Sequence, residues 1–149
     1  VNEAVKHIIT IINNCTKKDT TVTIENVNID VSKDGKAAMA VQGKGDTTVK
    51  LKGDNTLKSG NSHAGVEKND STSNGKLTIT ADSTQDSLVA SGGSNAAGIG
   101  SSGGKQGTSK LAIEGGTITA TGGLYGAGIG GGRGDDYRKC GHQKSTGKL

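Results

Sequence analysis

Residues 111–132 have the sequence LAIEGGTITATGGLYGAGIGGG, and this stretch decides the fold. Apolar residues alternate with polar ones in two short runs, and a glycine-rich segment separates these runs from a third aliphatic position, Ile129. Alternation with a period of two is typical of β-strands that bury one face. Three short strands joined by tight turns predict one coil of a parallel β-helix.

The same order of anchors recurs along the chain, which predicts a stack of such coils. Four apolar-x-apolar triplets start 27, 28 and 34 residues apart: Val22-Thr23-Ile24, Val49-Lys50-Leu51, Leu77-Thr78-Ile79 and Leu111-Ala112-Ile113. Second anchors follow at Ile29, Leu57, Leu88 or Val89, and Ile118, and third anchors follow at Val41, Val66, Ile99 and Ile129. We therefore expect an all-β, right-handed parallel β-helix of about four to five coils over residues 21–132, because stacking buries the inner faces.

The composition favours a narrow solenoid. The chain has 149 residues, with 26 glycines, two tyrosines and no proline, phenylalanine or tryptophan. A wide core is hard to build without aromatic rings, whereas stacked aliphatic side chains fill a narrow bore. No apolar run approaches the roughly 18 residues of a transmembrane helix, so we expect no membrane insertion.

The two ends of the chain depart from the repeat. Residues 1–20 have two interpretations, a capping helix near residues 2–9 or a partial first coil through Ile9-Thr10-Ile11. The helix is favoured by the spacing of Val1, Ala4, Val5, Ile8 and Ile12. Residues 133–149 lack the aliphatic period and are expected to form an irregular basic tail. Cys15 and Cys140 would lie at opposite ends of the stack, beyond disulfide reach, and are expected to be free thiols.

The formal net charge of +4 is concentrated in the tail, which carries five basic and two acidic residues. The coiled body is therefore almost neutral and offers no electrostatic footprint for a nucleic acid. It also lacks the aromatic platforms on which unpaired bases stack. The chain starts at Val1 with no signal peptide before it, which indicates a mature or excised segment.

Several stretches resemble known bacterial repeats. Residues 113–123, IEGGTITATGG, and 126–132, GAGIGGG, are similar to repeats in large surface proteins of clostridia and related Firmicutes, and residues 91–100, SGGSNAAGIG, form a second copy. Residues 22–41 and 49–66 resemble coils of a bacterial carbohydrate-binding β-helix family. Members of that family have folds like those of pectate lyases, bind acidic plant polysaccharide and calcium, and lack lyase activity.

The resemblance covers about residues 20–132 and implies a function. It implies a non-catalytic polysaccharide-binding module of a secreted or cell-surface bacterial protein, either a monomer or part of a larger multidomain protein. No binding motif matches position by position, so no individual ligand residue is transferred. The alternative is a structural stalk or adhesin segment that acts as a spacer or binds a host protein.

Outward positions of the first triplets predict a polar face. One expected row is Thr23, Lys50, Thr78 and Ala112, and the next is Glu25, Lys52, Thr80 and Glu114. Lys50 and Lys52 would then bind sugar hydroxyls or a uronate carboxylate beside Thr78 and Thr80. The alternative is a solvated face on which Glu25 and Lys52 form an ion pair worth a few tenths of a kcal/mol. Tyr125 is the one aromatic within the coils that could stack on a sugar ring.

Calcium is the candidate cofactor, and it requires six to eight oxygen ligands. Acidic and amide pairs in turns are Asp54 with Asn55, Glu67 with Asp70, Asp82 with Asp86, and Asp135 with Asp136. We select Asp82 and Asp86 as metal ligands, although turns favour aspartate for backbone reasons as well.

The sequence does not indicate an enzyme, and we assign no catalytic residue. The histidines His7, His63 and His142 are scattered, and the two arginines lie at or beyond the last coil. Cys140-Gly141-His142 supplies two ligands where tetrahedral zinc needs four. Arg133-Gly134-Asp135 spells an integrin-recognised tripeptide, a match too short to assign a function.

Overall fold

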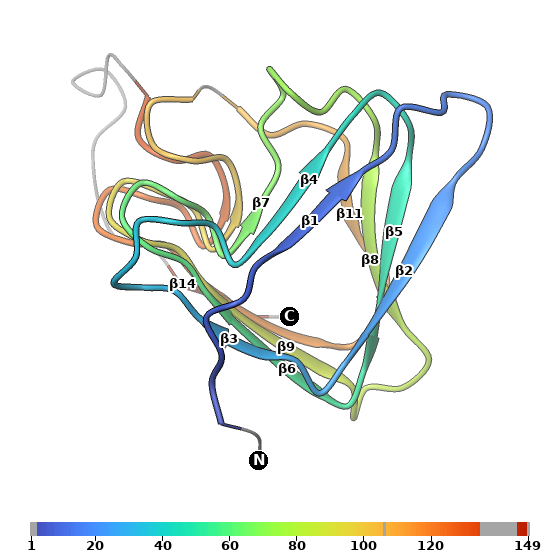
Figure 1. The fold of residues 1–149 in the computed structure, drawn as a ribbon, viewed down its shortest axis with the longest axis horizontal. Helices are drawn as coiled ribbons and strands as arrows, with labels where there is room; N and C mark the ends of the chain where they lie inside the picture. Colours follow the sequence, from blue (N-terminus) through green and yellow to red (C-terminus); the bar gives the residue numbers. More distant parts are fainter. Residues whose placement is uncertain (1–2, 106, 135–145, 149) are drawn as a thin grey trace.

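The computed structural model describes residues 3–105, 107–134 and 146–148, which form three parallel sheets wound into a solenoid. Figure 1 looks along the stack, and the sheets form the three sides of a triangle. The all-β parallel solenoid is thereby confirmed. Its right-handed sense stays a prediction, in line with the strong preference of parallel crossovers for that hand. No helix in this described part is long and apolar enough to cross a membrane.

Each coil contributes one strand to each sheet, so strands three apart along the chain are neighbours. The first sheet contains β1 (Ile9–Ile12), β4 (Met39–Gln42), β7 (Val66–Glu67), β10 (Ile99–Gly100) and β13 (Ile129–Gly130). The second sheet contains β2 (Thr20–Glu25), β5 (Thr47–Lys52), β8 (Leu77–Ala81) and β11 (Leu111–Ile113). The third sheet contains β3 (Asn28–Asp30), β6 (Asp54–Lys58), β9 (Ser87–Ser91), β12 (Thr117–Thr121) and β14 (Thr146–Lys148).

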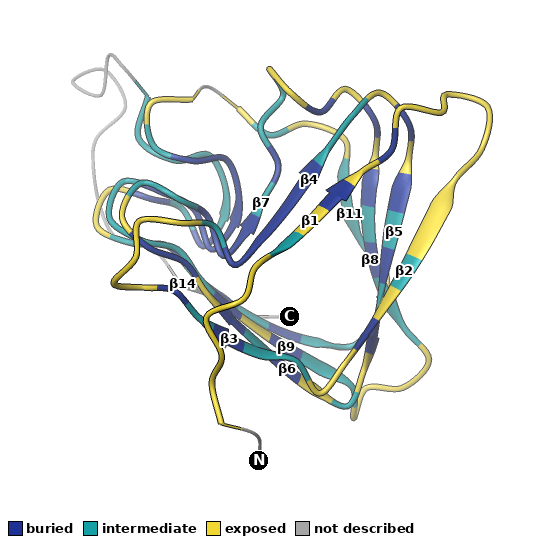
Figure 2. Ribbon diagram, in the orientation of Figure 1, coloured by how far each residue is buried: buried dark blue, intermediate teal, exposed yellow. Residues whose placement is uncertain are grey.

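Aliphatic side chains from all three sheets fill the bore (Figure 2). Leu51 and Ile79 from the second sheet, Leu57 from the third and Ile99 from the first are completely buried. Because the strands are parallel and in register, like side chains stack one rung apart, at about 4.8 Å. The core is thus a set of aliphatic columns with no need for aromatic rings.

The observed register differs from the expected one by two residues at several steps. Val49 pairs with Ile79 instead of Leu77, Val66 with Met39 instead of Val41, and Leu57 with Ala90 instead of Leu88. Val89, the other expected anchor, is exposed and faces outward, so that alternative is wrong. A slip of two residues keeps every side chain on the same face of its strand. Alternation in the sequence therefore identified the strands and their inner faces but not their alignment.

The amino-terminal segment forms a partial first coil. β1 pairs in parallel with β4, and Val5 bridges to Ile29 of β3. The capping helix near residues 2–9 is therefore wrong for the described residues. The run of β-branched residues in β1 suits an extended strand, in which Ile11 is buried and Ile12 is exposed.

The carboxy-terminal tail also contributes to a sheet. β14 pairs antiparallel with β12 and covers the edge of the third sheet, so the expectation of an irregular tail is wrong for Thr146–Lys148. Residues 135–145 and 149, including Cys140, His142 and Asp135, lie outside the described residues. Cys15 is exposed and free, as expected.

Glycines let successive coils touch at the corner between the third and first sheets, where Figure 1 shows the loops nested on one another. A Cβ added to Gly93 would lie 1.9 Å from the carbonyl oxygen of Gly60, and one added to Gly123 would lie 2.0 Å from that of Gly93. The spacing of the hydrogen-bond ladder leaves no room to move these backbones apart. Only glycine fits at these positions.

We predict that Gly93→Ala lowers the free energy of unfolding by roughly 1–3 kcal/mol or more, because the new methyl group forces the two coils apart. Gly131→Ala is the matched control, since its Cβ would meet nothing nearer than the Ser101 hydroxyl at 3.9 Å. Urea unfolding followed by circular dichroism measures both. An equal loss in the two variants would show that close approach is not the constraint at Gly93.

Candidate functional site

The outer face of the second sheet carries two rows of polar side chains. Thr21, Thr48 and Thr78 lie side by side on β2, β5 and β8, and Thr23, Lys50 and Thr80 form the next row. Lys52 lies beside Glu25 at the ends of their strands. We call Thr21, Thr23, Thr48, Lys50, Lys52, Thr78 and Thr80 the threonine–lysine face.

The five threonine hydroxyls of this face are available to an external partner. None of them hydrogen-bonds another group within the described residues. Thr21 and Thr23 are exposed, and Thr48, Thr78 and Thr80 are half-buried between neighbouring strands. The hydroxyls therefore form a fixed array that repeats from rung to rung.

Both lysines of the face form ion pairs. Lys50 Nζ lies 2.9 Å from Asp82 Oδ2, and Lys52 Nζ lies 3.5 Å from Glu25 Oε2. The second pair confirms the cross-strand pairing expected from the sequence. A depression of about 400 Å³ beside these pairs is lined by Thr23, Lys50, Leu51, Lys52, Asp82 and Asp86. Four of the sequence-predicted site residues are thus brought together around one hollow.

The structure corrects the expected rows and separates one residue from them. Lys50 lies beside Thr80, whereas Thr78 lies beside Thr48 in the other row. Tyr125 lies in the turn between β12 and β13, at the corner of the other two sheets, and does not join the face. Its ring is 37% exposed, and the guanidinium carbon of Arg133 lies 5.5 Å from the ring centroid.

The two aspartates selected for calcium each have a partner already. Asp82 pairs with Lys50, and Asp86 Oδ1 accepts a hydrogen bond of 2.9 Å from the Gly53 amide. In the part of the chain that the structure describes, no three His, Cys, Asp or Glu side chains are grouped closely enough to hold a metal ion. A calcium ion between Asp82 and Asp86 would have to draw its other ligands from backbone carbonyls or water, and it stays a prediction.

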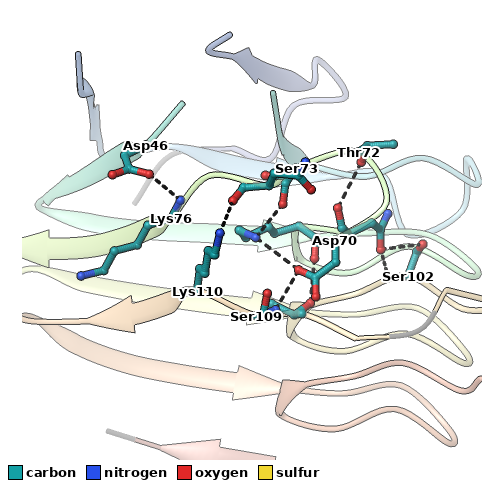
Figure 3. Close-up of polar contacts among 12 residues, drawn as sticks. Asp46, Asp70, Thr72, Ser73, Lys76, Ser102, Ser109 and Lys110 are labelled. Carbon is teal, nitrogen blue, oxygen red and sulfur yellow. Dashed lines mark hydrogen bonds and ion pairs between the residues drawn. The ribbon is translucent and has the colours of Figure 1, made fainter. Parts of the chain in front are cut away.

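A buried lysine, Lys68, lies at the corner that leads from β7 into β8, beside Asp70 and Ser73, which Figure 3 labels. The Lys68 side chain is 1% exposed, and its ammonium donates to the Ser73 carbonyl at 3.0 Å and lies 3.5 Å from Asp70 Oδ1. Burial lowers the pKa of Lys68, and the Asp70 charge opposes that shift. Asp70 Oδ1 also accepts a bond of 2.8 Å from the Ser109 amide in the next coil.

Other bonds at this corner join three successive coils. Asp46 Oδ1 accepts from the Lys76 amide at 2.8 Å, and the Lys110 ammonium donates to the Asn74 carbonyl at 3.0 Å (Figure 3). These contacts lie immediately before β5, β8 and β11. They therefore fix where the strands of the threonine–lysine face begin.

Sequence reasoning missed part of the face and all of the corner network. Thr21 and Thr48 were not selected, although the repeated segments Thr20-Thr21-Val22 and Thr47-Thr48-Val49 gave a signal for them. The Lys50–Asp82 pair could be predicted only from the true register of β5 and β8. No sequence pattern indicated that Lys68 is buried, because lysine is seldom buried and its partners lie in a loop.

No protein-family model, curated protein or solved structure matches this chain. The chemistry of the threonine–lysine face therefore rests on its own residues. These residues supply hydroxyls, two paired ammonium groups and the carboxylates that pair with them.

We predict that Asp70→Asn flattens the acid dependence of stability. Burial alone would raise the pKa of Asp70, but hydrogen bonds from Ser109 and the charge of Lys68 lower it on balance below its ordinary value of 3.8. The charged form thus stabilises the fold above the unfolded-state pKa, and this contribution is lost as the pH falls through the lowered pKa.

The expected result is a lower free energy of unfolding for Asp70→Asn at neutral pH and a shallower fall between about pH 5 and pH 2. Urea unfolding across this range measures both quantities. Asp19→Asn, which removes an exposed carboxylate, is the control and should keep the wild-type slope. An unchanged slope in Asp70→Asn would contradict the assignment.

Proposed function

We propose that this chain is a non-catalytic polysaccharide-binding module and that the threonine–lysine face holds an extended glycan. The supporting observation is the array of five threonine hydroxyls without partners among the described residues, on three successive rungs. A polymer repeats its hydroxyl groups along its length, so it can use every rung of such an array. A compact ligand would reach only one or two of them.

Hydrogen bonds carry recognition on this face because Tyr125, the aromatic within the coils, lies at another corner. Each hydrogen bond contributes about 1 kcal/mol net, so four or five of them support roughly millimolar affinity. A long glycan raises the observed affinity by presenting many equivalent segments. The proposed module is therefore a weak binder of single short oligosaccharides.

The cellular setting is part of the same proposal. Resemblance of the GAGIGGG-type repeats to clostridial surface proteins supports a secreted or cell-surface location in a bacterium, as a monomer or within a larger multidomain protein. The almost neutral body supports a partner other than nucleic acid. Calcium bound at Asp82 and Asp86 remains a proposed cofactor.

A structural stalk or adhesin segment is the second proposal, and the first coil favours it. Val5, Ile8 and Ile12 are 44%, 47% and 62% exposed. Among the described residues, β1 and β2 each have a strand neighbour on one side only, so the backbone edge of this coil can accept a further strand. In a spacer the coils themselves are the function, and the threonine–lysine face needs no ligand.

We predict that the double variant Thr78→Val/Thr80→Val weakens glycan binding by about tenfold or more, since two hydrogen-bonding hydroxyls are replaced by methyl groups of the same shape. Calorimetric titration against a panel of soluble polysaccharides, with and without calcium, measures the affinity. Circular dichroism checks that the fold is kept.

Thr56→Val is the matched control, because Thr56 occupies an outward position on β6 in the third sheet. It should leave the affinity unchanged. Equal affinity of the double variant and the wild type would place the binding site elsewhere. Failure of the wild type to bind any polysaccharide would exclude the proposed function and leave the stalk.

A further inference from the structure

We infer that the glycan held by the threonine–lysine face is uncharged rather than acidic. The inference rests on the proposed function and names the ligand class of the same face. Its basis is that both lysines are already neutralised, Lys50 by Asp82 at 2.9 Å and Lys52 by Glu25 at 3.5 Å. The face offers no unpaired cation to a carboxylate ligand.

Acidic groups outnumber basic groups at the end of this face where Lys50 and Lys52 lie. The Glu114 amide donates to the Ile79 carbonyl at 2.8 Å, which continues the ladder between β11 and β8 and brings Glu114 beside Thr80. Lys50 and Lys52 therefore share the face with three carboxylates, those of Glu25, Asp82 and Glu114. A polymer with one negative charge per sugar would be repelled by this excess, because like charges brought together oppose association.

A carboxylate ligand would also have to compete with Asp82 for the Lys50 ammonium. One ion pair would replace another, so the exchange would gain little, and the displaced carboxylate would repel the ligand. Asp82 lines the hollow, so its displaced carboxylate would still lie near a ligand bound there. An acidic sugar thus gains little binding free energy from Lys50.

A sugar hydroxyl, in contrast, can hydrogen-bond to the ion pair without breaking it. It accepts a hydrogen bond from the Lys50 ammonium or donates one to the Asp82 carboxylate, because a hydroxyl both donates and accepts. The Lys50–Asp82 pair and the Thr23 hydroxyl at the hollow, with the Thr80 hydroxyl beside Lys50, then form one mixed set of donors and acceptors. Such a set matches the vicinal hydroxyls of a neutral glycan.

The first test compares ligands on the wild-type protein. Uncharged soluble glucans, xylans and mannans are titrated beside polygalacturonate, with calcium and with a chelator, at about 50 mM and about 500 mM salt. We expect an uncharged glycan to bind at least about fivefold more tightly than polygalacturonate, with less than about twofold change between the two salt concentrations.

Tighter binding of polygalacturonate than of every uncharged glycan, with or without calcium, would overturn the inference and leave the proposed function standing. Binding of no polysaccharide at all would overturn both.

The second test changes the charge without changing the shape. Asp82→Asn leaves Lys50 unpaired and should raise the affinity for polygalacturonate about threefold to tenfold at low salt, a gain that salt should remove. Asp34→Asn is the matched control, since it also removes one carboxylate from a surface ion pair, with Lys6 at 4.0 Å. It should change the affinity less than about twofold. The same gain in both variants would show that net charge, not pairing at the face, sets the preference, and would overturn the inference.

Discussion

The structure depends on backbone-to-backbone contact between successive coils, seen at the corner between the third and first sheets. Gly60, Gly93 and Gly123 stack there so closely that a Cβ on either of the last two would collide with the carbonyl of the glycine before it. The spacing of the parallel ladder is thus imposed on the loops as well as on the strands. This constraint explains why glycine recurs at this one position in successive coils. It also keeps the bore narrow, so aliphatic side chains fill it.

Two buried polar side chains, those of Asn55 and Lys68, bind backbone groups in this thin core. Asn55 is buried on β6, where its Oδ1 accepts from the Val27 amide at 2.9 Å and its amide donates to the Lys52 and Ser87 carbonyls. Lys68 lies at another corner, where its ammonium binds Asp70 and the Ser73 carbonyl within one loop. Asp70 in turn accepts a bond from the Ser109 amide in the next coil, so each buried side chain contributes to a link between coils. Polar burial therefore fixes the positions at which strands begin, rather than adding to the apolar core.

The sequence was sufficient for the fold class because buried and exposed positions alternate with a period that only strands satisfy. It was not sufficient for the register. The step from Val49 to its true partner Ile79 contains two more residues than the step to Leu77, and turns absorb them without altering the alternation. The Lys52–Glu25 pair was predictable because the step between β2 and β5 was aligned correctly. Lys68 and its partners depend on loop conformation, which alternation does not describe.

The electrostatic character of the threonine–lysine face follows from that register. If β8 were shifted so that Leu77 met Val49, Asp82 would move about 7 Å along the strand direction, away from Lys50. The ammonium would then be unpaired, and the face would attract carboxylates. The observed register is supported by the contact between the starts of β5 and β8, where the Lys76 amide donates to Asp46 Oδ1 at 2.8 Å. A contact at one corner therefore contributes to which charges meet on the adjoining sheet, and with them to the class of polymer that the sheet accommodates.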